Sequence, residues 1–141
     1  MRYQRIENEK EAVSYRVTQR GAHVADFSYH FEEGNIAARE EDRRFWLDGV
    51  TLFGEFACYE YLDEILQFAG YKCCCAGIHA MYLKISGKNL FYLELYKKFG
   101  FYVIAEEEYQ IHKGISAYDY VMKYPLPRSR EEAFDHYIRR K

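Results

Sequence analysis

The order of apolar and polar positions divides the chain into a strand-rich first third and a later region in which helices and strands alternate. Residues 11–19 and 22–31 are predicted strands joined around Gly21. In the second of these, apolar and polar side chains alternate with a period of two, as in a half-buried strand. A third strand is expected within residues 35–47, where the charged run AAREEDRR interrupts the pattern.

From residue 51 to residue 69 the spacing becomes helical. Apolar side chains recur at intervals of three and four, and acidic side chains mostly take the other side. Thr51 is the expected N-cap of this helix, and Gly70 is the expected residue just past its end. The apolar stripe consists of Leu52, Phe56, Tyr59, Leu62, Leu66 and Ala69.

Turn-forming glycine, asparagine and proline residues mark the ends of the predicted elements in the second half of the chain. Turn chemistry at Ser86–Asn89 and a glycine at position 100 bound a predicted helix, and Pro125 and Pro127 end the sheet because proline cannot donate to a strand ladder. The predicted elements are a strand at 76–85, a helix at 90–99, strands at 101–112 and 115–124 that form a hairpin, and a C-terminal helix at 129–140 that opens on a capping box.

This order predicts an α+β domain with a mixed, mostly antiparallel sheet flanked by helices and followed by a short C-terminal helix. At 141 residues the chain is expected to form a single domain over 1–141, with a core at about 11–124 and the last helix at about 129–140. A domain of this length buries on the order of 70% of its unfolded surface, so it does not need disulfides to fold.

Charge and composition exclude several classes of partner. The 20 basic and 22 acidic residues are interspersed, so we expect no nucleic-acid partner. No apolar run approaches the roughly 18–20 residues of a membrane span, and no apolar segment follows the start, so we expect no membrane partner and a cytoplasmic protein with reduced cysteines. Fifteen Tyr and ten Phe predict extensive aromatic packing or an aromatic contact surface, as in a small dimer-forming interaction protein.

One stretch carries a family resemblance. Asn89, followed by Leu95-Tyr96-Lys97-Lys98-Phe99-Gly100-Phe101, resembles the C-terminal half of the GCN5-related N-acetyltransferase (GNAT) fold, in which an Asn after the fifth strand precedes a helix ending in "LYxxxGF". The order of elements over 11–124 agrees. The resemblance implies an acyl-CoA-dependent N-acyltransferase that uses acetyl-CoA and modifies an amine of a small molecule or protein. It also implies that the fourth and fifth strands splay apart to hold the pantetheine, and that a homodimer is a common assembly.

The resemblance assigns Tyr96 as the general acid. A phenol, with an ordinary pKa near 10, is suited to giving a proton to a departing thiolate. The structural alternative is an interfacial aromatic on an amphipathic helix. Asn89 likewise has two open roles, since it either hydrogen-bonds near the pantetheine or caps the helix that follows.

The resemblance places the pyrophosphate at the N-terminus of the helix after the fourth strand, at a Q/R-x-x-G-x-G/A loop. Gly49 and Gly54 are the candidates here, without that spacing, and Asp48 adds an unfavourable negative charge that Arg43 and Arg44 could offset. A second hypothesis is therefore a non-catalytic GNAT-like binding or regulatory protein that has lost the cofactor loop, because the fold alone does not determine function.

The remaining candidates are weaker. Glu40, Glu41, Glu55 and His79 are candidates for the general base by vicinity only. Residues 73–75 are three consecutive cysteines, and on a strand they would point to alternate faces, so no metal site is predicted. The sequence holds no phosphate-binding loop, nucleophile elbow or zinc-protease motif.

Overall fold

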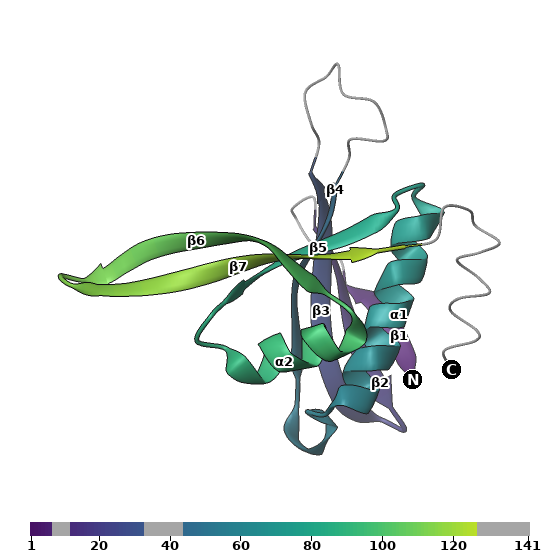
Figure 1. Ribbon diagram of the computed structural model, residues 1–141. Coiled ribbons are helices and arrows are strands. Elements are labelled where there is room, and N and C mark those ends of the chain that lie inside the picture. Colours follow the sequence, from purple (N-terminus) through teal and green to yellow (C-terminus); the bar gives the residue numbers. More distant parts are fainter. Residues whose placement is uncertain (7–11, 33–43, 127–141) are drawn as a thin grey trace.

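The computed structural model describes residues 1–6, 12–32 and 44–126. Glu40, Glu41, Arg43 and the C-terminal helix predicted at 129–140 lie outside this range. The described elements follow one another along the chain as Figure 1 shows. They are β1 (Arg2–Ile6), β2 (Val13–Gln19), β3 (Ala22–Glu32), β4 (Arg44–Leu52), the short 3₁₀ helix η2 (Gly54–Phe56), α1 (Tyr59–Cys75), β5 (Ala80–Ser86), α2 (Leu90–Phe99), β6 (Tyr102–His112) and β7 (Ile115–Pro125).

The strands form one sheet in the order β1-β2-β3-β4-β5-β7-β6. Every neighbouring pair is antiparallel except β4 and β5, which run parallel. α1 and α2 pack on the same face of this sheet (Figure 1), and in the described part of the chain no helix covers the other face. The prediction of an α+β domain with a mixed, mostly antiparallel sheet is confirmed.

The core lies between the two helices and the sheet face that they cover. Aromatic side chains fill much of it: Tyr3 stacks on Phe68 of α1 with ring centroids 4.0 Å apart, and Tyr15 stacks on Phe27 at 5.2 Å. Packing therefore accounts for part of the high Tyr and Phe content. The largest fully buried side chains are Phe45, Leu62, Ile65, Leu66, Met81 and Met122.

The prediction of the first helix was wrong in its bounds. Residues 50–52 belong to β4, where Val50 and Leu52 are buried and Leu52 pairs with Ala25 of β3. Thr51 is thus an exposed strand residue and not an N-cap. Gly70 lies inside α1 and does not end it, because its missing side chain allows a close approach: a Cβ there would lie 3.2 Å from Leu126.

Three further predictions are corrected. Residues 73–75 form the last turn of α1 and not a strand. β5 is displaced by up to four residues from the strand expected at 76–85, so His79 precedes it and is exposed. The sheet also begins before residue 11, because β1 pairs with β2 although only one side of this edge strand packs on the core.

The third strand, expected within 35–47, is observed as β4 at Arg44–Leu52, and residues 35–43 lie outside the described range. The other predicted elements that the structure describes are confirmed. β2 and β3 are joined around Gly21, and α2 covers 90–99 as predicted. Gly100 ends α2 with φ of +129°, a conformation that side chains other than glycine rarely adopt. Its N–H and that of Phe101 both donate to the Tyr96 carbonyl, which closes the last turn.

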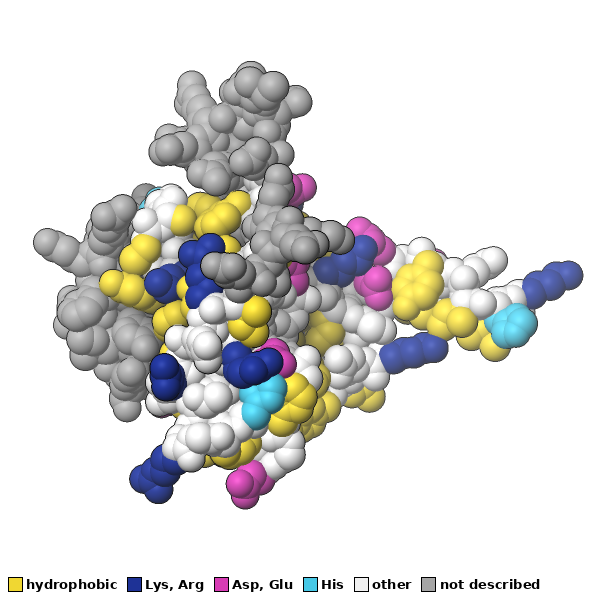
Figure 2. All heavy atoms as spheres, turned by 180° about the vertical axis from the view of Figure 1, so that it is seen from behind, with side chains coloured by type: hydrophobic (Ala, Val, Ile, Leu, Met, Phe, Trp, Pro, Cys, Tyr) yellow, Lys and Arg dark blue, Asp and Glu magenta, His cyan; other side chains and the backbone are white. Residues whose placement is uncertain are grey.

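The β6–β7 hairpin extends from the body as an arm (Figure 1). Every residue of β6 is exposed. From behind, hydrophobic side chains lie beside acidic ones along it (Figure 2). The exposed apolar side chains of the arm are Tyr102, Val103, Ile104, Tyr109, Ile111, Ile115 and Tyr118. The homodimer stays a prediction.

No helix within the described ranges has the length and apolar character needed to cross a membrane.

Candidate functional site

The two parallel strands at the centre of the sheet pair over only part of their length. Residues 45–47 of β4 are in register with residues 81–83 of β5. Pairing ends at Leu47 and Leu83, while β4 continues to Leu52 and β5 to Ser86. The centre of the sheet therefore opens toward the carboxyl ends of these strands.

A β-bulge lies where the opening begins. Leu47 pairs with Tyr29 and Gly49 pairs with Ser28, so Asp48 is an extra residue on β4. A bulge bends its strand and redirects side chains. Here it keeps both Leu47 and Val50 on the buried face and leaves Asp48 and Gly49 exposed.

A cavity of about 270 Å³ occupies the gap between the separated strands. It brings together three of the residues singled out from the sequence, Tyr96, Asn89 and Gly49. α2 supplies Tyr92 and Tyr96 to its wall. The full lining is Leu47, Asp48, Gly49, Val50, Thr51, Leu83, Lys84, Ile85, Ser86, Asn89, Tyr92 and Tyr96.

Tyr96 is 4% exposed and yet lines this cavity. Burial raises the pKa of its phenol above the usual range, Tyr92 adds to the effect, and a backbone hydrogen bond from Val50 works in the opposite direction. The phenol is therefore protonated at neutral pH.

Tyr92 was missed by the sequence reasoning. Its hydroxyl accepts a hydrogen bond from the Leu52 N–H at 2.9 Å, which ties α2 to the open end of β4. The available signal was its spacing, because residues i and i+4 share a helix face and Tyr92 precedes Tyr96 by four. The two ring centroids are 6.3 Å apart.

Asn89 occupies the N-cap position of α2, but its side chain makes no capping hydrogen bond. The capping role favoured by its position is therefore wrong. The side chain is exposed and lines the cavity.

The two glycines predicted for one cofactor loop lie in different elements. Gly49 lies within β4, whereas Gly54 lies in η2, in the connection between β4 and α1. Asp48 lies within β4, and the rest of β4 and η2 separate it along the chain from the start of α1 at Tyr59. Arg44 lies at the opposite end of β4, with its guanidinium 5.0 Å from the centroid of the Tyr82 ring.

The N-terminus of α1 carries charges of both signs. The N-cap residue Cys58 makes no side-chain capping bond to the backbone. Hydrogen bonds from the Glu60 backbone and the Cys58 side chain lower the pKa of the Glu60 carboxyl, and Lys98 of α2 contributes in the same direction. The Lys98 ammonium lies 4.3 Å from the centroid of the Tyr59 ring. Lys98 is therefore a cation held beside a helix N-terminus, and the sequence reasoning did not single it out.

The described candidates for the general base lie elsewhere. Glu55 and His79 are exposed, and neither lines the cavity. Asp48 does line it, and Oδ1 of Asp48 lies 2.5 Å from Nδ1 of His30 on β3. The sequence signal for Asp48 was the break in alternation between Leu47 and Val50, which is typical of a bulge. Within the described ranges, no group of three or more potential ligands could hold a metal ion.

No family model matches the chain. No curated protein matches it by sequence. Solved structures do match it by fold. Nourseothricin acetyltransferase is 12% identical and superposes with a TM-score of 0.66 over 86% of this chain and 69% of its own. An acetyltransferase from Bacillus subtilis in complex with CoA is 12% identical, with a TM-score of 0.64 over 83% and 78% of the two chains.

A third structure is a GNAT family acetyltransferase from Elizabethkingia anophelis with acetyl-CoA bound. It is 12% identical, with a TM-score of 0.62 over 82% of this chain and 77% of its own. These likenesses show that the chain has the GNAT fold, as its resemblance over residues 89–101 indicated.

Proposed function

We propose that the protein is an acyl-CoA-dependent N-acyltransferase that transfers an acetyl group to an amine. The observation that carries this proposal is the opening of the β4–β5 pair at Asp48, with a cavity that Tyr96 lines. Solved structures of the same fold with CoA or acetyl-CoA bound support it. The same comparisons are with acetyltransferases, so they give no support to the non-catalytic alternative.

The residues around the gap fit the donor. Acetyl-CoA supplies an activated thioester at the end of an extended arm that carries amide groups. Residues 48–52 of β4 line or border the gap without a β5 partner. The Leu52 N–H already donates to Tyr92, and Val50 hydrogen-bonds Tyr96 through its backbone, so the remaining backbone groups of this segment are those that can pair with the amides as a strand would. The side chain of Asn89 lies in the same wall. The Lys98 ammonium and the backbone N–H groups in the first turn of α1 can bind a phosphate group, provided that the Glu60 carboxylate moves away from this turn.

Tyr96 is the proposed general acid. Its raised pKa keeps the hydroxyl protonated at neutral pH, so it has a proton to give to the sulfur that leaves the thioester. Its hydroxyl is held near the backbone of Val50, within the segment proposed to bind the donor.

Acetyl-CoA binding is tested by thermal shift. At 100 times Kd the ligand adds about 2.7 kcal/mol of stability, which raises Tm by several degrees. Lys98→Gln should weaken binding, because it removes the cation beside the α1 N-terminus. Lys97→Gln is the matched control, since this neighbouring lysine is exposed and has Glu94 as its partner at 3.9 Å. No shift of the wild-type protein at millimolar acetyl-CoA would overturn the proposed function.

Turnover tests the role of Tyr96. Tyr96→Phe should lower kcat by about 10²-fold or more and leave acetyl-CoA affinity nearly unchanged, because it removes only the proton donor. Tyr102→Phe, on the exposed side of β6, is the control. Unchanged turnover in Tyr96→Phe would remove this residue from the mechanism.

A further inference from the structure

We propose that Tyr92 is a latch on the donor gap: its hydroxyl holds the Leu52 N–H until an amide carbonyl of the donor's arm takes its place. This inference rests on the proposed function and deepens it, since it names a bond that must be exchanged when the donor binds and re-formed when the thiol product leaves.

The pairing of β4 with β3 decides which backbone groups of β4 face the gap. In an antiparallel pair, residues that hydrogen-bond across the ladder alternate with residues that do not. The Phe53 N–H donates to the Val24 carbonyl of β3 at 3.0 Å, so Thr51, two residues earlier, also turns its backbone groups toward β3. Val50 and Leu52 alternate with these residues and therefore turn their N–H and C=O groups toward the gap.

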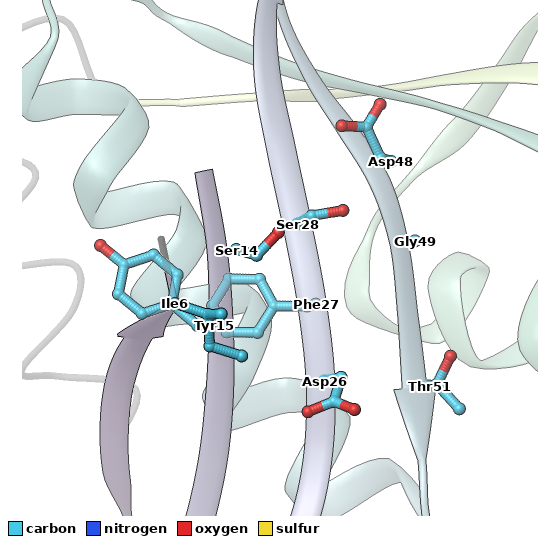
Figure 3. A pocket seen from close by; sticks show the side chains of 9 residues that line it. All are labelled: Ile6, Ser14, Tyr15, Asp26, Phe27, Ser28, Asp48, Gly49 and Thr51. Carbon is cyan, nitrogen blue, oxygen red and sulfur yellow. The ribbon is translucent and has the colours of Figure 1, made fainter. Parts of the chain in front are cut away.

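The open end of β4 also borders a second cavity. This cavity has a volume of about 390 Å³ and lies over β2, β3 and β4 at the end of β1. Figure 3 shows Asp48, Gly49 and Thr51 along its β4 side, with the β3 residues beside them. A Cβ built on Gly49 would meet no atom within 4 Å, so the strand is loosely surrounded here. Lateral hydrogen bonds from α2 therefore matter for holding this end of β4.

Two tyrosine hydroxyls of α2 stand in for a neighbouring strand along this edge. The Leu52 N–H donates to the Tyr92 hydroxyl at 2.9 Å, and Val50 hydrogen-bonds Tyr96 through its backbone. The spacings match, because four residues of a helix rise about 6 Å and two residues of a strand about 6.6 Å. The segment proposed to bind the donor is thus already partly paired, by side chains of its own chain.

Of the two tyrosines, Tyr92 is the one placed to exchange. Tyr96 is 4% exposed, and its carbonyl accepts the N–H groups of Gly100 and Phe101 that close the last turn of α2. Tyr92 is half-buried and lies in the first turn, where the N-cap side chain makes no hydrogen bond. Its ring meets Phe91 edge-on at 5.3 Å, and Phe91 is 51% exposed, so space open to solvent adjoins the Tyr92 ring.

The bond at Leu52 can be exchanged but not simply lost. Leu52 is 7% exposed, and a buried backbone N–H without an acceptor is strongly unfavourable. An amide carbonyl is the acceptor that the N–H groups of strands ordinarily meet, so the donor's arm offers an equivalent partner. Because Tyr92 competes with that carbonyl, its hydroxyl weakens donor binding and favours release of the thiol product.

The binding of two ligands to Tyr92→Phe tests the latch. Acetyl-CoA carries the amide arm, whereas adenosine 3′,5′-bisphosphate carries phosphates without the arm. Isothermal titration should give a Kd for acetyl-CoA about 5-fold lower in Tyr92→Phe than in the wild type, and the same Kd for the bisphosphate. CoA should dissociate correspondingly more slowly from the variant. The control is Tyr82→Phe, whose ring lines neither cavity, and it should leave both Kd values unchanged.

A measurement on the wild-type protein needs no variant. In its amide NMR spectrum, the Leu52 resonance should move on addition of acetyl-CoA, because the acceptor changes from a phenol to a carbonyl. It should stay in place on addition of the bisphosphate. The Phe53 amide is the internal reference, since it donates to Val24 of β3 throughout.

The outcomes separate the two proposals. Wild-type protein that binds acetyl-CoA, together with equal or weaker binding by Tyr92→Phe, overturns the latch and leaves the proposed function standing. An equal gain for both ligands would mean that the variant loosens the whole site, and it also overturns the latch. So does a Leu52 resonance that stays in place when acetyl-CoA binds. A wild-type protein with no acetyl-CoA thermal shift overturns the proposed function itself, and the latch with it.

Discussion

The two ends of the β4–β5 pair show how one pair of strands serves both stability and a site. At the closed end, Phe45 and Leu47 alternate regularly with outward residues, and they pair with Met81 and Leu83 in a fully packed core. At the open end, one extra residue at Asp48 breaks the alternation and the strands separate around a cavity. The sequence difference between the two ends is therefore a single extra residue. Its consequence is the separation of the strands, because strand pairing depends on register.

A titratable side chain lies buried under each end. Cys73 of α1 lies under the closed end, with its Sγ 3.5 Å from the Ala80 carbonyl at the start of β5. Tyr96 lies under the open end. Burial raises the pKa of both groups above their usual ranges, but of the two only the phenol lines the cavity at the gap. Burial alone therefore does not mark a site, whereas burial beside an opening does.

The largest expected effect is at the closed end. Phe45→Ala removes a side chain that is 0% exposed, and it should lower the free energy of unfolding by about 3–5 kcal/mol through lost burial and a cavity. Urea denaturation measures the change. Thr51→Ala, an exposed position at the open end of the same strand, should change stability by less than about 0.5 kcal/mol. Similar losses in the two variants would contradict the contrast between the ends.

A smaller effect is expected where α2 is tied to the open end. Tyr92→Phe removes the acceptor of the Leu52 N–H and should cost about 1–3 kcal/mol, because that backbone donor is left unsatisfied. Amide hydrogen exchange at Leu52 should accelerate. Tyr82→Phe is the control, since it keeps the ring that contacts Arg44 and Lys123 on the uncovered face. Unchanged exchange at Leu52 would show that the bond does not hold the gap.

Alkaline pH should lower the free energy of unfolding, through groups that are buried under both ends of the strand pair. Burial raises the pKa of Tyr96 and of Cys73, and it raises the pKa of Cys74 to about 11. Above about pH 9 the unfolded chain loses these protons first, so the folded state binds more protons and stability falls as pH rises. The slope is up to about 1.4 kcal/mol per pH unit for each such group.

Urea denaturation under reducing conditions at pH 8 and at pH 10.5 tests this dependence. Tyr96→Phe should show a shallower loss, because it removes one of the groups. Equal stability at the two pH values would contradict the burial of these side chains.

The smallest effect is expected where the open end of β5 meets the arm. Lys84 contacts Glu107 of β6 at 2.6 Å, but both side chains are about half exposed. Lys84→Gln should therefore change stability by less than about 1 kcal/mol, and the difference from wild type should shrink in high salt. Thermal unfolding at low and high NaCl concentration measures it. A larger loss that salt does not reduce would mean that Lys84 supports the gap by packing.

Sequence reasoning located the elements with clear local signals. α2 and the β6–β7 hairpin were predicted because glycine and proline mark their ends and their periodicity is strong. The β4–α1 boundary was misplaced because Leu52 fits two patterns: it is spaced by two from Val50 and by four from Phe56. An edge strand such as β1 was missed because only part of it packs on the core.

The site was harder to predict, since it depends on contacts between distant segments. Tyr96 and Asn89 came only from the family resemblance. The contact between His30 and Asp48 joins two strands whose register no local pattern specifies. The bulge left a visible break in alternation, but only the observed pairing shows that this break coincides with the end of β4–β5 pairing.

The arm formed by β6 and β7 has a practical consequence for handling the protein. Its turn at Lys113 and Gly114 lies at the end of a hairpin that projects from the body (Figure 1), and no arm residue lines either cavity described above. A peptide tag inserted at this turn would leave the core and both cavities intact, because exposed loop tips accept insertions well. The turn thus offers a point at which the protein can be attached to a surface with both cavities left accessible.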